Sequence, residues 1–118
     1  MKTNPLTIDY SPFCHSDATY RAEYVPLPTG VELLAIVFSP PQTVNSPVIL
    51  FIPGFVSLIE NFRETLVELT RTHTVIYVET REKSTARINP DHRFSVDEIT
   101  ADIVHFAKLM IPDPAPYV

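Results

Sequence analysis

The side chains of this sequence that could attack or coordinate a substrate are scattered rather than grouped. A thiol and an imidazole are adjacent at Cys14-His15. No third group is placed by spacing to orient them, so we interpret Cys14 as an inert residue. The other histidines, His73, His92 and His105, show no zinc-ligand spacing, and we expect no metal site.

Two serines stand in a pattern that favours a structural role. Ser57 precedes Glu60 by three residues and Ser95 precedes Glu98 by three, and an apolar helical pattern follows each. Both are typical of capping boxes, in which the serine is the helix N-cap. We therefore predict caps, each contributing about 1 kcal/mol, and not nucleophiles.

Composition narrows the possible functions further. The chain has 118 residues, a formal net charge of −5 and a single cysteine, so we expect one domain, no disulfide, and no nucleic-acid or membrane partner. Its only glycines, Gly30 and Gly54, cannot form a dinucleotide or phosphate loop, and we expect no cofactor. No apolar signal core follows Met1, which predicts a cytoplasmic protein.

The patterning predicts an α/β fold, with an N-terminal arm over residues 1–18 and a domain over 19–118. Tyr20–Val25 and Val31–Phe38 should form an antiparallel hairpin that turns at Gly30. Val48–Ile52 and Thr74–Val78 are apolar runs typical of buried parallel strands, joined by a helix. That helix should begin at Ser57 and bury Ile59, Phe62, Leu66 and Leu69.

A second helix is predicted from Ser95 to the prolines that begin at Pro112. Its spacing predicts a buried face made of Val96, Ile99, Ile103, Phe106 and Met110. Tyr117-Val118 would open another strand. The long connection Glu79–Phe94 carries four basic residues: Arg81, Lys83, Arg87 and Arg93. We interpret it as a solvated loop in which Arg81 pairs with Glu79 or Asp91. The alternative is an anion-contact loop beside a cleft, formed by those basic residues.

These elements and several short motifs together resemble the α/β-hydrolase family. Pro53-Gly54-Phe55 stands where members carry His-Gly-x, and Val75–Arg81 where they read apolar-apolar-Asp-x-Arg-Gly. Ser95–Glu98 with Asp102 is similar to the family's Ser-x-Asp-Asp and following Asp. The resemblance covers residues 20–118. It implies a serine hydrolase of esters, amides or related acyl compounds, with the strand at 74–78 between those at 31–38 and 48–52.

The resemblance also implies a site at the turn after the strand at 48–52. In the family, a backbone N–H just after His-Gly helps to form the oxyanion hole. Carried over, that donor is the Phe55 N–H, supported by the turn at Gly54. A donor of this kind stabilises the transition state by about 3–4 kcal/mol.

The sequence contains no G-x-S-x-G, the elbow that carries the family's nucleophile, and the family's acid and histidine follow that elbow. The first hypothesis is therefore an N-terminal hydrolase segment, truncated before the elbow and inactive alone. The second is a small non-enzymatic interaction domain that retains half the fold. The strand at 48–52 would be an open edge, so we expect a complementary C-terminal hydrolase segment or self-association there.

Overall fold

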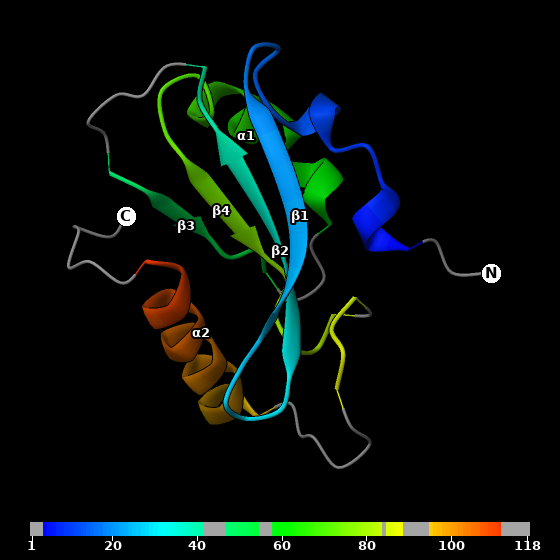
Figure 1. The fold of residues 1–118 in the computed structure, drawn as a ribbon, viewed down its shortest axis with the longest axis vertical. Coiled ribbons are helices and arrows are strands. Elements are labelled where there is room, and N and C mark those ends of the chain that lie inside the picture. The colour runs from blue at the N-terminus through cyan, green and yellow to red at the C-terminus, as the bar shows by residue number, and fades with distance from the viewer. Residues whose placement is uncertain (1–3, 42–46, 55–57, 84, 89–94, 112–118) are drawn as a thin grey trace.

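The computed structural model describes residues 4–41, 47–54, 58–83, 85–88 and 95–111, and its centre is a four-stranded sheet (Figure 1). The strand order is β1-β2-β4-β3, which is the predicted order. The strands are β1 (Thr19–Pro26), β2 (Glu32–Ser39), β3 (Ile49–Phe51) and β4 (Val75–Val78).

The hairpin of β1 and β2 is confirmed. The two strands are antiparallel, with Thr19 opposite Ser39 and Pro26 opposite Glu32. Gly30 turns the chain with a φ of 88°, in the left-handed region that a residue without Cβ adopts at little cost. β2 then pairs antiparallel with β4, and β4 pairs parallel with β3.

Both faces of the sheet are covered, as the all-apolar sequence of β4 predicts. Alternate residues of each strand belong to two separate clusters, because side chains along a strand point to opposite faces. Leu33, Ile76 and Phe106 belong to the first cluster, and Phe38 and Tyr77 belong to the second. The first cluster packs against helix α2 (Val96–Met110), and the second against helix α1 (Arg63–Leu69).

The strand β3 is less buried than its apolar sequence suggests. Ile49, Leu50 and Phe51 are half-buried, and Ile52 is 43% exposed. Within the described residues β3 pairs with β4 alone, so one of its sides lacks a neighbouring strand. The expectation of burial on both faces is therefore wrong for this strand.

The first helix begins later than the Ser57 capping box predicts. A 3₁₀ turn, η3 (Ile59–Phe62), leads into α1, and Leu58 occupies its N-cap position without a side-chain hydrogen bond. Ser57 itself, the predicted N-cap, lies outside the described residues. The predicted apolar face is confirmed, since all four of its residues join the second cluster: Ile59, Phe62, Leu66 and Leu69.

Helix α2 begins as predicted but packs differently. The Ser95 hydroxyl accepts a hydrogen bond from the Glu98 N–H, which confirms the cap. Val96 is 73% exposed, however, so its predicted burial is wrong. Ile103 and Phe106 of α2 pack against the first cluster, while Glu98 and Asp102 in the earlier turns contact Arg81, in the loop after β4. None of the described helices is both long and apolar enough to cross a bilayer.

The N-terminal segment folds against the second face of the sheet. It contains the short turns η1 (Pro5–Thr7) and η2 (Ser11–Phe13), and it buries Tyr10 and Cys14 in the second cluster. The His15 N–H donates to the Thr70 hydroxyl at 2.8 Å, which ties the segment to the end of α1. The division of the chain at residue 18 stays a prediction.

Candidate functional site

The candidate oxyanion turn follows β3, and only part of it can be described. Phe55 lies outside the described residues, while Pro53 is buried and Gly54 is exposed. The Lys83 ammonium donates to the Gly54 carbonyl at 2.6 Å. Because β3 and β4 are parallel, their carboxyl ends meet at one edge of the sheet, and this bond joins the two connections that leave it.

Arg81 pairs with two carboxylates of α2 that the sequence analysis did not expect, and Asp91, one of its two expected partners, lies outside the described residues. The Arg81 guanidinium donates two hydrogen bonds to the Asp102 carboxylate of α2, from Nε to Oδ2 at 2.6 Å and from Nη2 to Oδ1 at 2.7 Å. Nη1 reaches Glu98 at 3.1 Å. Arg81 and Asp102 are buried, and the Asp102 hydrogen bond raises the pKa of Arg81 further. The sequence analysis missed these partners because α2 brings two carboxylates to a side chain 17 and 21 residues away.

Of the other basic residues of the loop after β4, the two that the structure describes contact the rest of the fold. The Arg87 guanidinium lies over the Tyr24 ring, 3.7 Å from its centroid, and near Glu32. Lys83 contacts the Gly54 carbonyl, and Arg93 lies outside the described residues. Arg87 and Lys83 therefore connect parts of the fold.

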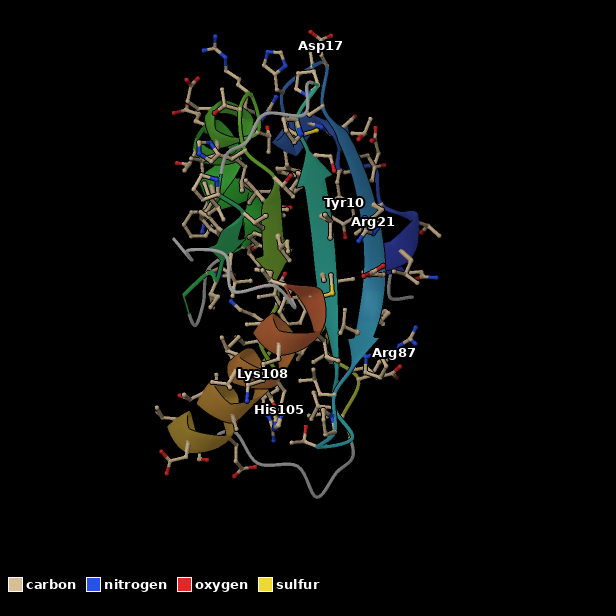
Figure 2. All side chains as sticks on the ribbon, turned by 60° about the vertical axis from the view of Figure 1, so that its left-hand side comes forward. Tyr10, Asp17, Arg21, Arg87, His105 and Lys108 are labelled. Carbon is tan, nitrogen blue, oxygen red and sulfur yellow. The ribbon has the colours of Figure 1, made fainter. Side chains whose placement is uncertain are left out.

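Cys14 and the described histidines have separate surroundings, although Cys14 and His15 are adjacent in the chain. Burial raises the pKa of the Cys14 thiol, which opposes thiolate formation. The His15 ring accepts from the Asp17 N–H, and the His73 ring contacts the Thr72 hydroxyl. His105 projects from α2 (Figure 2). Across the described ranges, no group of His, Cys, Asp and Glu is arranged to hold a metal ion, and His92 lies outside them.

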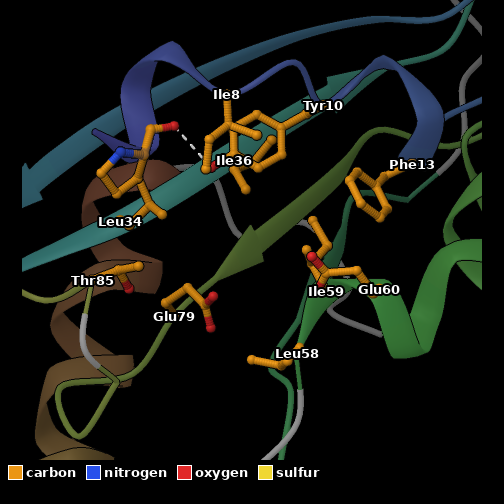
Figure 3. A pocket seen from close by; sticks show the side chains of 11 residues that line it. Ile8, Tyr10, Phe13, Leu34, Ile36, Leu58, Ile59, Glu60, Glu79 and Thr85 are labelled. Atoms are coloured by element: carbon orange, nitrogen blue, oxygen red, sulfur yellow. Dashed lines mark hydrogen bonds between the residues drawn. The ribbon is translucent and has the colours of Figure 1, made fainter. Parts of the chain in front are cut away.

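A cavity of about 160 Å³ opens on the second face, between the N-terminal segment and the start of η3 (Figure 3). Its lining includes the polar residues Glu60, Glu79 and Thr85. Glu79 follows β4 and continues the alternation of Val75 and Tyr77, which places it on this face. The apolar lining comes from the N-terminal segment, β2 and η3: Ile8, Phe13, Leu34, Ile36, Leu58 and Ile59, with Pro5 and the Tyr10 ring.

Several polar atoms near this cavity are buried without a hydrogen-bond partner among the described residues. They include Glu79 Oε2, Thr85 Oγ1 and the Tyr77 hydroxyl. Burial raises the pKa of Glu79; Lys83 opposes that rise, while Glu60 adds to it. Burial also raises the pKa of Tyr10 to about 12 and raises that of Tyr77. The sequence analysis treated Glu79 only as a possible partner of Arg81, although strand alternation could have placed it on this face.

Comparison with known proteins shows which architecture these elements form. No protein-family model and no curated protein matches the chain. Among solved structures, the hypothetical protein PA2218 from Pseudomonas aeruginosa matches with a TM-score of 0.70 and 16% identity, over 97% of this chain and 37% of that one. This chain has part of the α/β-hydrolase fold.

Two further structures share this partial hydrolase fold. The Cif epoxide hydrolase from Acinetobacter nosocomialis matches with a TM-score of 0.66 and 16% identity, over 83% of this chain and 29% of that one. A bacterial membrane phospholipase A matches with a TM-score of 0.62 and 16% identity, over 75% and 27%. These similarities confirm the predicted fold class. The chain spans about a quarter to just over a third of the length of these three proteins.

The buried ion pair supports a prediction about stability. Arg81→Ala should lower the free energy of unfolding by about 3–5 kcal/mol, because it leaves the Asp102 carboxylate buried without its cation. Arg71→Ala removes the same side chain from an exposed pair with Glu68 and should cost at most about 1 kcal/mol. Denaturant unfolding of both variants measures the difference, and equal losses would contradict a structural role for the Arg81–Asp102 pair.

The buried carboxyl of Glu79 supports a prediction about pH. Its folded-state pKa is raised, so the folded protein holds the proton more tightly than the unfolded chain. Stability from this group is therefore present below the unfolded pKa and is lost as pH rises through the folded pKa. Glu79→Gln cannot ionise, so we expect its stability relative to wild type to increase as pH rises from about 4 to about 8.

The measurement is the free energy of unfolding across that pH range. Glu64→Gln, at an exposed position of α1, controls for the loss of one negative charge. A stability difference between wild type and Glu79→Gln that does not change with pH would mean that Glu79 ionises in the folded protein as readily as in the unfolded chain.

Proposed function

We propose that this chain supplies the N-terminal strands and helices of a serine hydrolase that acts on esters, amides or related acyl compounds. Hydrolysis would require a further segment that carries the nucleophile. The main support is the partial fold: the sheet ends, within the described residues, at β3, and the chain spans only a quarter to just over a third of the solved proteins with this fold.

The open edge of β3 supports a complementary segment. The Ile49 N–H donates to the Thr74 carbonyl at 2.9 Å, toward β4. Successive residues of a strand direct their backbone groups to alternate sides, so the N–H and C=O of Leu50 point away from β4. Such groups are a template for another strand. In the family that the chain resembles, the strand that pairs with this edge of β3 leads to the nucleophile.

The turn after β3 would then contribute to the chemistry. In this proposal the Phe55 N–H donates to the oxyanion that forms when the nucleophile attacks the acyl carbon. The bond between Lys83 and the Gly54 carbonyl supports it, because it ties the preceding residue to the loop after β4. The chain itself contains no G-x-S-x-G, so the attacking group comes from the complementary segment.

A second candidate is a small interaction domain without catalysis. It is favoured by apolar side chains that remain exposed on α2, where Val104 is 45% and Leu109 is 54% exposed. A partner protein could cover them together with the β3 edge. The two candidates differ in whether a reactive serine appears once a complementary segment is present.

A fluorophosphonate probe and an activated ester distinguish these candidates. We expect no labelling and no ester hydrolysis by the chain alone, because its serines lack an elbow and a base. When the chain is produced together with the coding sequence that follows it, the hydrolase proposal expects one labelled serine, within a G-x-S-x-G. Stoichiometric labelling of Ser57 or Ser84 in the chain alone would contradict the proposal, and a longer product that stays unlabelled would favour the interaction domain.

The open edge also predicts self-association of the chain alone. At micromolar concentration we expect dimers or larger species in sedimentation. Ile52→Lys should shift them toward monomer, because a lysine beside an open strand opposes edge pairing. Leu6→Lys is the matched control, since Leu6 is similarly exposed, at 40% against 43%, but lies in the N-terminal turn η1. A monodisperse wild-type monomer with slow amide exchange at Ile49–Phe51 would rule out an open edge.

A further inference from the structure

We propose that the cavity beside Glu79 binds a small primary ammonium ion with an apolar body about the size of one aromatic ring. The site is separate from the oxyanion turn and requires no nucleophile. It therefore goes beyond the hydrolytic function proposed above.

The walls of the cavity select an apolar body. Ile8, Leu34, Ile36 and Ile59 line it, and the ring of Tyr10 closes one side (Figure 3). Its volume is about 160 Å³, close to that of an apolar protein cavity of about 150 Å³ that holds benzene. One ring or a short branched alkyl group fits this space.

The polar residues of the cavity offer acceptors. Glu79 and Thr85 line it, and one oxygen of each side chain, Oε2 and Oγ1, is buried without a hydrogen-bond partner within the described residues. The Tyr10 hydroxyl already donates to the Pro5 carbonyl at 2.8 Å, so that donor is engaged. An ammonium group has three N–H donors and no acceptor. It is therefore complementary to a carboxylate oxygen and a hydroxyl oxygen.

Charge favours the same ligand. The carboxylates of Glu60 and Glu82 act on Glu79 electrostatically, and Lys83 opposes them. The Lys83 ammonium donates a hydrogen bond to the Gly54 carbonyl at 2.6 Å. The ionisable groups around Glu79 thus leave an excess of negative charge, which attracts a cation and repels a carboxylate ligand.

The pKa of Glu79 is raised although Lys83 opposes the rise. Burial disfavours its charged form, and the phenols of Tyr10 and Tyr77 nearby carry no compensating positive charge. An ammonium ion placed against Glu79 would stabilise the carboxylate and lower that pKa again. Ordered water is the alternative occupant of such a cavity, and it would show no preference for a charged ligand.

Ligand-observed NMR with benzylamine as the probe tests the proposal, and it is usable whether the chain is monomeric or associated. Benzyl alcohol has the same ring without the charge. We expect wild type to bind benzylamine at millimolar concentration and about tenfold or more tightly than benzyl alcohol. Glu79→Gln should weaken benzylamine binding by about tenfold or more, whereas Glu64→Gln, which loses the same charge on α1, should leave it unchanged.

A second pair of variants tests the position of the site. Ile8→Lys places an ammonium on the lining of the cavity, where it competes for Glu79, and should weaken benzylamine binding by about tenfold. Leu6→Lys adds the same charge outside the lining and should not. Circular dichroism checks that each variant is folded.

Three results would overturn the proposal. They are no benzylamine binding by wild type, equal binding of benzylamine and benzyl alcohol, and equal binding of benzylamine by wild type and Glu79→Gln. None of these results bears on the fluorophosphonate experiment, which tests the hydrolytic function independently.

Discussion

The buried pair of Arg81 and Asp102 determines how the parts of this structure fit together. Arg81 lies in the connection after β4, and Asp102 lies in the middle of α2. Thr29, from the turn between β1 and β2, donates to the same carboxylate. The ion pair of Arg81 and Asp102 therefore connects the hairpin turn, the loop after β4 and the second helix. An ion pair removed from water must be nearly complete in its hydrogen bonds, which restricts α2 to one position on the sheet.

The elements could be predicted from the sequence because their signals are local. Alternation in β1, the apolar run of β4 and the glycine at residue 30 each act over a few residues, and all three are confirmed. The order of the strands came from the resemblance. The helix starts were less regular: Ser95 caps its helix, whereas the first helical turn begins at Ile59 with Leu58 as its N-cap.

The candidate site could be predicted only in part, because its interactions join residues far apart in the chain. Arg81 has equally suitable acids close in sequence, and only the packing of α2 selects Asp102. The cavity at Glu79 depends on the N-terminal segment, whose polar sequence indicates no particular docking place. The turn at Gly54 lies where the resemblance implied, at the end of β3, while the backbone donor of Phe55 lies outside the described residues.

Docking of the N-terminal segment has a consequence for the order of folding. The bond between His15 and Thr70 spans 55 residues, and β2 cannot pair with β4 until residues 75–78 have been made. Contacts between distant parts of a chain form slowly, because the intervening loop must close first. During synthesis this segment therefore emerges before α1 and β4, and it can dock only after they have been made. The N-terminal segment, which forms one wall of the cavity at Glu79, is thus synthesised before the other walls but reaches its place after them.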